Sequence, residues 1–247
     1  MAYRTKADFF VGKKCLLCKG PSCVQMAPNY GTDIMAFNTV KVLTTHHWNT
    51  GLFSFSVERP TSFRFVSGQF VMLGLMVNGK PLLRAYSIVS PFWEESLEFL
   101  SIIIPDGPLT SHLYKIKPGD EILLGEKPTG TLTMDALTPG KRLHMIGTGT
   151  GLAPWISIIR DPGVYERFEH ITVQHTVRQV EDLAYRGLLE SKLASDPLVA
   201  DEARLQLTYD QSVTKCPTWT DENRRITDRI ACGDYPLDPA TDRVMLC

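Results

Sequence analysis

The sequence predicts a two-domain protein, an antiparallel β-barrel followed by an α/β domain with a doubly wound parallel sheet. Between Thr39 and Thr133, six short β-type runs are separated by Gly, Pro and Asn-Gly turns, which is typical of a closed antiparallel barrel. After Pro139-Gly140, strands alternate with helical patterns, and this alternation favours a parallel sheet that binds its ligand at the carboxyl ends of the strands. A chain of 247 residues with 43% hydrophobic residues is long enough to give each domain a core.

The strands predicted for the barrel are runs rich in β-branched, aromatic and aliphatic residues. Turn residues such as Gly51, Pro60 and Pro91 separate these runs, and one brief helix is predicted over Leu109–Tyr114. The predicted strands are Val40–Thr45, Leu52–Val57, Phe70–Leu75, Leu83–Val89, Leu97–Ile104 and Glu121–Leu124.

The second predicted domain opens with the short apolar strand Leu143–Ile146. Pro154 suits the first turn of a helix that reaches about Arg160, and Asp161-Pro162-Gly163 ends this helix. The rest of the domain is predicted as strand Ile171–His175, a helical segment with Leu183, Ala184, Leu188 and Leu189, strand Leu205–Tyr209, and a buried final strand, Arg243–Cys247.

The predicted domain boundaries are 37–138 for the barrel and 139–247 for the α/β domain. Residues 1–36 are set apart as an N-terminal extension whose status the sequence leaves open. This extension holds Cys15-x-x-Cys18-x4-Cys23, a spacing of soft ligands that could form part of a metal site or cluster. A fourth ligand is missing nearby, so we expect no protein metal site.

Charge and hydropathy exclude several classes of partner. The net charge of −1 gives no global signal for nucleic acid or an anionic membrane. No apolar run approaches the roughly 20 residues of a membrane span, and the N-terminus does not resemble a secretory signal. We expect a cytoplasmic protein without a disulfide framework.

Two short segments carry the chemistry. Arg84-Ala85-Tyr86-Ser87 places a cation, an aromatic ring and a hydroxyl on one strand, where Arg can bind a diphosphate and Tyr can stack on a planar ring. Burying Arg84 within its apolar run would be costly without an anion. Gly147–Pro154 is a glycine turn that opens onto a helix, although Leu152 stands where the third glycine of G-x-G-x-x-G belongs. Backbone amides at a helix N-terminus attract a second anionic group, so the pair predicts binding of two nucleotides.

These two segments, together with Asp106–Ser111, resemble the bacterial ferredoxin/flavodoxin–NADP+ reductases. The resemblance runs from about Phe37 to Cys247. Three further segments reinforce it, namely Ser67–Met72, Lys127–Leu132 and Val164–Phe168.

For the flavin, the resemblance implies a site for FAD on the barrel. Arg84 would bind the diphosphate of FAD, Tyr86 would stack beside the isoalloxazine, and Ser87 would lie near flavin N5 as a catalytic residue. The other FAD-binding residues implied are Ala85, Phe99, Ser101, Ile102, Gly107, Leu109, Thr110 and Ser111.

For the second nucleotide, the glycine turn Thr148-Gly149-Thr150-Gly151 would bind the pyrophosphate of NADPH/NADP+. Arg178, in His175-Thr176-Val177-Arg178 after the next strand, favours a 2′-phosphate and hence NADPH. Arg225 matches a second phosphate-binding Arg of the family, although a run of Arg can equally be a solvated surface. Lys215 stands where relatives often have Arg, and Cys247 matches the family's catalytic-site cysteine beside the nicotinamide.

The resemblance therefore implies an FAD-dependent oxidoreductase that transfers a hydride between NADPH and flavin N5, and electrons to or from ferredoxin or flavodoxin. We expect it to act as a monomer. One alternative is a flavin-binding electron-transfer component of an oxygenase system. A second is a truncated FAD-binding protein with little turnover, since related sequences continue past Cys247.

Overall fold

A computed structural model describes residues 36–216, 218–219 and 222–247. The cysteines Cys15, Cys18 and Cys23 lie outside the described residues. Within the described part of the chain, no group of three His, Cys, Asp or Glu side chains is arranged to hold a metal ion. In the same residues no helix has the length and hydropathy to cross a membrane.

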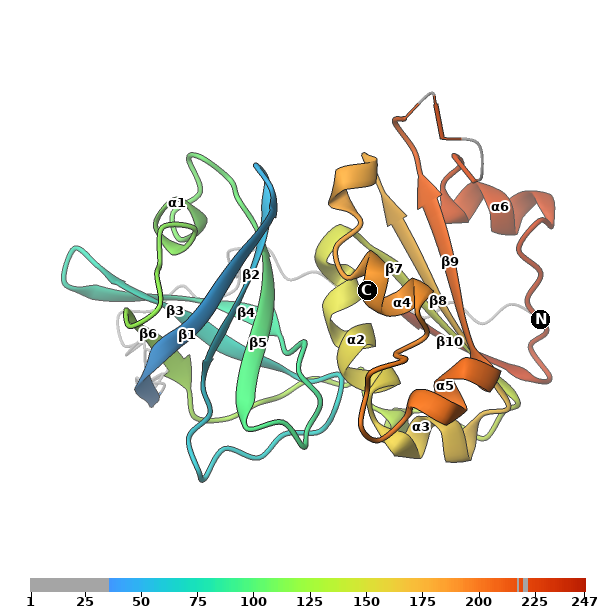
Figure 1. The fold of residues 1–247 in the computed structure, drawn as a ribbon, viewed down its shortest axis with the longest axis horizontal. Helices are drawn as coiled ribbons and strands as arrows, with labels where there is room; N and C mark the ends of the chain where they lie inside the picture. The colour runs from blue at the N-terminus through green and yellow to red at the C-terminus, as the bar shows by residue number, and fades with distance from the viewer. Residues whose placement is uncertain (1–35, 217, 220–221) are drawn as a thin grey trace, which may run out of the picture. The chain divides into compact units, whose positions relative to one another are not determined.

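The first domain is a six-stranded antiparallel barrel, as predicted (Figure 1). Its strand order is β4-β3-β6-β1-β2-β5. The barrel closes between the first and last strands of this order. There Ile88 forms a bridge with Phe99, and the Val89 N–H donates to the Glu98 carbonyl. The elements are β1 (Phe37–Asn49), β2 (Leu52–Glu58), β3 (Phe70–Val77), β4 (Lys80–Ser87), β5 (Ser96–Ile102), α1 (Thr110–Leu113) and β6 (Glu121–Gly125).

The barrel core forms from side chains that alternate along its strands. On β2, Phe53, Phe55 and Val57 are almost fully buried, and Phe55 packs against Phe99 of β5 with ring centroids 5.6 Å apart. Leu113 of α1 belongs to the same cluster. The brief helix therefore covers apolar surface of the barrel, and the turn before it is fixed in place.

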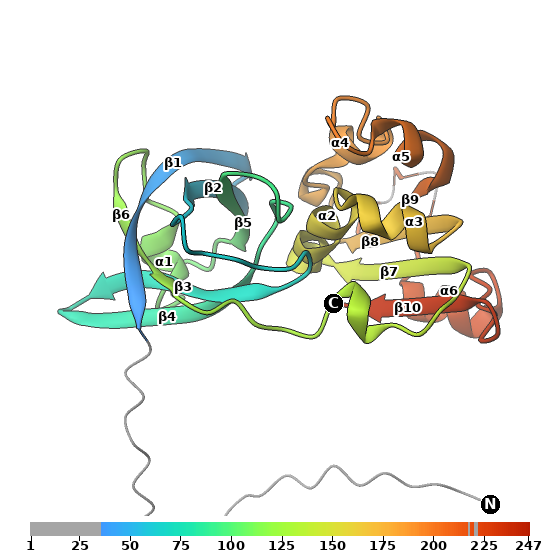
Figure 2. The same ribbon diagram turned by 90° about the horizontal axis from the view of Figure 1, so that it is seen from below.

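The second domain is a four-stranded parallel sheet in the order β10-β7-β8-β9 (Figure 2). Its strands are β7 (Arg142–Thr148), β8 (His170–Val177), β9 (Leu207–Val213) and β10 (Asp242–Leu246). Its helices are α2 (Ala153–Ile159), α3 (Pro162–Arg167), α4 (Arg186–Glu190), α5 (Ala200–Gln206) and α6 (Ile226–Cys232), and the 3-10 turns η1 (Met134–Ala136), η2 (Gly149–Leu152) and η3 (Val180–Asp182) complete the elements.

The order of the strands places helices on both faces of this sheet. The chain steps from β7 to β8 to β9 and then returns to the other side of β7 for β10, so the last crossover runs over the opposite face. Residues of α2, α3 and α5 share one core, whereas Ile226 of α6 packs with Ile146 and Tyr235 in a separate cluster. The strand order reverses between β7 and β10, and at such a switch point α/β sheets bind their ligands.

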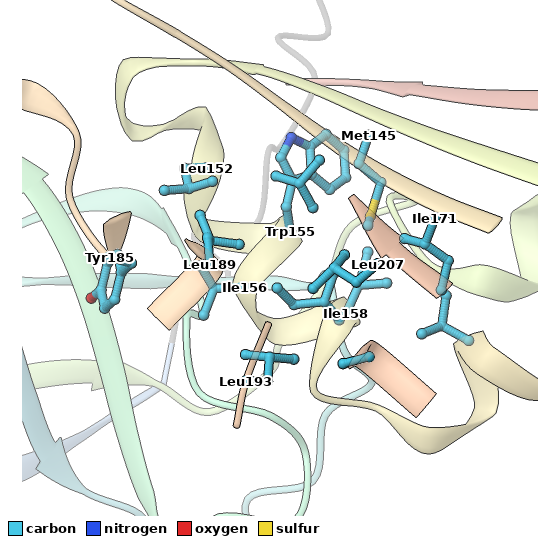
Figure 3. Packing of buried hydrophobic residues seen from close by; sticks show 14 of the residues in the cluster. Met145, Leu152, Trp155, Ile156, Ile158, Ile171, Tyr185, Leu189, Leu193 and Leu207 are labelled. Atoms are coloured by element: carbon cyan, nitrogen blue, oxygen red, sulfur yellow. The ribbon is translucent and has the colours of Figure 1, made fainter. Parts of the chain in front are cut away.

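Helix α2 is buried along its whole length. Figure 3 shows Trp155, Ile156 and Ile158 of this helix packed with Met145 and Ile171 of the sheet. A Cβ on Gly147 would lie 2.7 Å from the Trp155 indole nitrogen, so the end of β7 needs glycine for this packing.

Contacts between β5, its preceding loop and the α/β elements hold the two domains together. Tyr185, in the left-handed region at φ 56°, donates its hydroxyl to the Glu98 carboxylate at 2.7 Å. Burial raises the pKa of Glu98. Ser157 of α2 donates to the Ser90 carbonyl at 2.9 Å, and Arg160 pairs with Glu94 at 2.6 Å.

Several sequence predictions for the α/β domain were incomplete or wrong. Asp161 ends α2 as predicted, but its side chain also accepts the Gly163 N–H and caps α3, which was not predicted. Leu205 lies in α5 with its side chain 75% exposed, so β9 begins only at Leu207. Strand β10 exists, but within the described part of the chain it is an edge strand that pairs with β7, and Val244 and Leu246 are exposed. The prediction of a buried final strand was therefore wrong.

Candidate functional site

Two adjoining pockets form the candidate site. The first, which we call the barrel pocket, has a volume of about 400 Å³. β4, β5 and the turn before α1 line one side of it, and the glycine turn after β7 lines the other. Its lining residues are Arg84, Ala85, Tyr86, Ser87, Leu100, Ser101, Ile102, Ile104, Gly107, Pro108, Leu109, Thr110, Thr150, Gly151, Ala153 and Cys247.

Arg84 stands exposed at the barrel pocket. Its guanidinium Nη1 donates to the Leu83 carbonyl at 2.8 Å. The apolar run around Arg84 does not bury it, because β4 pairs with β3 over this stretch and the run is left partly open. The cation is therefore solvated in the structure and accessible to an anion.

Tyr86 is fixed as a wall of the barrel pocket. Ser101 donates its hydroxyl to the Ile102 carbonyl at 3.1 Å, so the Tyr86 hydroxyl is the donor in its 3.3 Å hydrogen bond to Ser101. The Tyr86 ring meets Phe99 edge-on, with centroids 6.4 Å apart, and burial raises the pKa of Tyr86. Phe99, a predicted ligand, is fully buried and does not line the pocket, so it supports Tyr86 from beneath.

The turn before α1 is held by its own hydrogen bonds. A Cβ on Gly107 would lie 2.3 Å from Thr110 Oγ1, so this position requires glycine. Thr110 donates its hydroxyl to the Ile104 carbonyl at 3.0 Å, which uses the one proton that the hydroxyl has to give. Ser111 donates its backbone N–H to the Gly107 carbonyl at 3.1 Å and does not line the pocket, unlike Gly107, Leu109 and Thr110.

The second pocket, which we call the sheet pocket, has a volume of about 640 Å³ and lies at the carboxyl ends of the parallel strands. It shares Ile102 and Thr150 with the barrel pocket, so the two are contiguous. Its lining residues are Gly51, Leu52, Ile102, Thr148, Gly149, Thr150, Thr176, Val177, Arg178, Asp182, Thr214, Arg225, Ile226 and Thr227.

The glycine turn packs tightly against the end of β10. A Cβ on Gly151 would lie 2.6 Å from the Cys247 carbonyl oxygen, and the Thr148 N–H donates to that oxygen at 3.2 Å. Gly149 has φ +57°, a conformation that favours glycine. Leu152, which replaces the third glycine of the motif, is fully buried in the α/β core.

Ser87 and Cys247, the two predicted catalytic residues, both line the barrel pocket. Ser87 lies opposite Phe70 at the end of the β3–β4 pairing. Partial burial raises the pKa of the Cys247 thiol, so this thiol is neutral at pH 7.

Arg178 and Arg225 are both exposed and both line the sheet pocket. Arg178 follows β8 directly, because the strand extends to Val177 rather than ending at His175 as predicted. Arg224, the neighbour of Arg225, is paired with Glu222 at 2.9 Å and does not line the pocket. Lys215 does not line it either.

An acidic residue that sequence reasoning missed, Asp182, also lines the sheet pocket. One of its carboxylate oxygens accepts from the Asn49 amide at 2.9 Å and the other from the Gln179 N–H at 3.1 Å. The spacing Gln179-x-x-Asp182 is a capping-box pattern and could have identified the second contact. Both oxygens are thus engaged by the protein.

Most other missed lining residues are apolar or small and carry no sequence signal for binding. In the barrel pocket they are Leu100, Ile104, Pro108 and Ala153, and in the sheet pocket Gly51, Leu52, Thr176, Val177, Thr214, Ile226 and Thr227.

Comparison with known proteins assigns a class to this arrangement. An oxidoreductase FAD-binding domain family matches residues 38–134, and an oxidoreductase NAD-binding domain family matches residues 145–247. The two families match the barrel and the parallel sheet in turn. This arrangement is that of an oxidoreductase with an FAD-binding domain and a nicotinamide-nucleotide-binding domain.

Individual relatives narrow the class. The chain is 47% identical over 217 residues to the ferredoxin–NADP reductase of Azotobacter vinelandii, covering 85% of this chain and 83% of the relative. It is 48% identical over 218 residues to the flavodoxin/ferredoxin–NADP reductase of Rhodobacter capsulatus, covering 83% and 78%. A ferredoxin NADP+ reductase from Neisseria gonorrhoeae, solved with bound FAD and NADP, aligns with a TM-score of 0.77 at 29% identity over 85% of each chain. The chain belongs to the ferredoxin–NADP reductase family.

Proposed function

We propose that this protein transfers electrons between NADPH and ferredoxin or flavodoxin through a bound FAD. The observation that carries the proposal is the contiguity of the two pockets, which share Ile102 and Thr150. A nicotinamide in one pocket and a flavin in the other would meet at this shared wall. Proximity and alignment of the two rings are what hydride transfer requires of the protein.

The barrel pocket suits FAD in its charge and shape. Arg84 offers an exposed guanidinium for the diphosphate, and Tyr86 offers a ring fixed by Ser101 and Phe99. The Gly107 turn leaves no room for a side chain, which allows close approach of backbone to a ligand. When bound, FAD supplies the hydride acceptor N5 and the ability to pass single electrons.

The roles proposed for individual residues follow from these positions. Ser87 and Cys247 line the barrel pocket and would contact the reacting rings, while Ala85, Ser101, Ile102, Leu109 and Thr110 would complete the flavin site. Because the Thr110 proton is given to Ile104, its hydroxyl would act on the turn and not as a donor to phosphate. Phe99 and Ser111 would act only through their neighbours.

The sheet pocket favours NADPH over NADH. Arg178 and Arg225 place two guanidinium groups on it, and such groups bind a 2′-phosphate. An acidic residue that binds the ribose hydroxyls would favour NADH, and the carboxylate of Asp182 is instead oriented by hydrogen bonds from Asn49 and Gln179. We further propose a monomer that acts in the cytoplasm.

The visible spectrum of the purified protein tests the proposal directly. We expect a bound, releasable flavin that is FAD, and bleaching of its absorbance when NADPH is added without oxygen. Reoxidation by ferredoxin or flavodoxin should then restore the spectrum. A protein that carries no flavin, or a flavin that NADPH leaves oxidised, would contradict the proposal. Iron and sulfide analysis of the same sample distinguishes a component of an oxygenase system that carries its own iron–sulfur cluster.

A further inference from the structure

The glycine turn is tied to a buried histidine that the proposed chemistry does not use. His175, in β8, has no exposed surface. Its Nε2 lies 3.0 Å from the Gly149 carbonyl oxygen, and its Nδ1 lies 3.4 Å from the Tyr209 hydroxyl of β9. A carbonyl can only accept, so Nε2 carries the proton and Nδ1 accepts from Tyr209.

This hydrogen bond fixes the orientation of one peptide group. In a trans peptide the carbonyl and the following N–H point in opposite directions. The Gly149 carbonyl points to buried His175, so the N–H of Thr150 points away from His175. Thr150 is the residue of the turn that lines both pockets.

Loss of the hydrogen bond from His175 would leave the Gly149–Thr150 peptide group freer to rotate. Gly149 has φ +57°, and no atom of the described residues lies within 4 Å of a Cβ position, so no side-chain contact at this position opposes a change of its backbone. The carbonyl also accepts the i→i+3 hydrogen bond of the 3-10 turn η2, so without His175 it would lose one of its two donors. The remaining 3-10 bond has poorer geometry, so the peptide could rotate toward solvent, which would present the carbonyl oxygen, and not an N–H, to an anionic ligand.

We propose that His175 is a positioning residue for the nicotinamide nucleotide, holding the Gly149 carbonyl so that the Thr150 N–H faces the pyrophosphate. This inference rests on the proposed function of the sheet pocket. Burial lowers the pKa of His175 to about 4, so the imidazole is neutral at pH 7 and keeps the single Nε2 proton that the contact needs. Because NADPH and NADH share the pyrophosphate, the effect should not depend on the 2′-phosphate.

Two variants separate the hydrogen bond from packing. His175→Gln keeps an N–H donor at nearly the place of Nε2, whereas His175→Leu fills similar space without a donor. Crystal structures of the holoenzymes should show the Gly149 carbonyl turned toward residue 175 in the parent and in His175→Gln, and rotated in His175→Leu. The same peptide orientation in all three would overturn the proposal.

Binding measurements test the consequence for the ligand. We expect His175→Leu to raise the dissociation constant of NADP+ about tenfold, the equivalent of one lost hydrogen bond, and His175→Gln to stay within about threefold of the parent. Adenosine 2′-monophosphate, which has the 2′-phosphate but no pyrophosphate, should bind all three equally. Equal losses for both ligands would indicate general damage and overturn the positioning role.

If the proposed function is wrong, the binding measurements give a different result. A parent protein that binds neither NADP+ nor adenosine 2′-monophosphate would reject the nucleotide assignment of the sheet pocket, whichever way the peptide points. A rotated peptide in His175→Leu with unchanged NADP+ affinity would reject only the role of His175. Tyr209→Phe, which removes the weaker 3.4 Å contact on Nδ1, should change NADP+ affinity less than His175→Leu does.

Discussion

Lowering the pH from 7 to 5 is expected to destabilise the α/β domain through the imidazole of His175. Burial lowers the pKa of His175 from its ordinary 6.5 to about 4 in the folded protein. Between these two values the unfolded chain binds a proton that the folded chain does not, so the free energy of unfolding falls as the pH falls. Above pH 6.5 both states are neutral and this contribution is constant.

The size of the effect follows from the two pKa values. At pH 5 most unfolded molecules are protonated at His175 and most folded ones are not, which lowers the free energy of unfolding by about 2 kcal/mol relative to pH 7. Below pH 4 the loss reaches its limit of about 3 kcal/mol. Burial also lowers the pKa of His144, so the parent protein includes a second contribution of the same sign. Comparison of the parent with His175→Gln isolates the contribution of His175.

Urea unfolding followed by far-ultraviolet circular dichroism, in excess FAD at pH 7, 6 and 5, measures this difference. We expect the free energy of unfolding to fall by about 2 kcal/mol less in His175→Gln than in the parent over this range. His170→Gln is the matched control, because it makes the same substitution at the exposed start of the same strand. An identical pH dependence in the parent and His175→Gln would refute the reasoning.

Three further predictions concern the pockets. Arg84→Ala should raise the dissociation constant of FAD about ten- to hundredfold, the effect of losing a charge-assisted hydrogen bond, as measured by fluorescence titration of the apoprotein. Arg178→Ala should raise the KM for NADPH by a similar factor and leave the KM for NADH nearly unchanged, and Arg225→Ala should do the same. Gly151→Ala places a Cβ 2.6 Å from the Cys247 oxygen, so it should cost about 1 to 3 kcal/mol of stability and slow flavin reduction by NADPH in stopped flow.

Matched controls make these outcomes specific. Arg204→Ala removes an exposed guanidinium whose ion pair with Asp201, at 3.6 Å, lies on the surface, and it should affect neither nucleotide. Gly187→Ala adds a Cβ with no atom within 4 Å and should leave flavin reduction unchanged. An equal loss for NADPH and NADH in Arg178→Ala would contradict its role at the 2′-phosphate. Unchanged FAD affinity in Arg84→Ala would contradict the diphosphate contact.

Local sequence patterns were sufficient to predict the strands. The six barrel runs and Leu143–Ile146 alternate or cluster apolar residues between turn residues, and each became a strand within a few residues of its predicted limits. Helices α3, α5 and α6 were not predicted, because six or seven residues are too few to establish a helical period, and α2, which is equally short, was predicted from the glycine turn and Pro154 at its start. Whether β10 is buried depends on its place in the sheet, and strand order is not a local property.

For the candidate site, too, the sequence predicts local features but not contacts between distant segments. Of the seventeen ligands predicted mainly from the family resemblance, fifteen line one pocket or the other, and Phe99 and Ser111 line neither. Their hydrogen-bonding state could not be read from the sequence. The Thr110 hydroxyl is engaged with Ile104, six residues away, and Asp182 is engaged with Asn49, 133 residues away. Such pairings arise only when the fold brings distant segments together.

The glycine turn illustrates how the sheet, and not the loop, determines the geometry where the pockets meet. Strand β7 ends in this turn, and its two neighbours each hold it: His175 of β8 binds the Gly149 carbonyl, and Cys247 after β10 packs against Gly151. Thr150 lies between these two points of attachment and lines both pockets. Because β8 and β10 flank β7 in one hydrogen-bonded sheet, a shift of either strand would move the Thr150 backbone. Alignment of two bound nucleotides at this residue therefore depends on strand pairing that lies beneath both pockets.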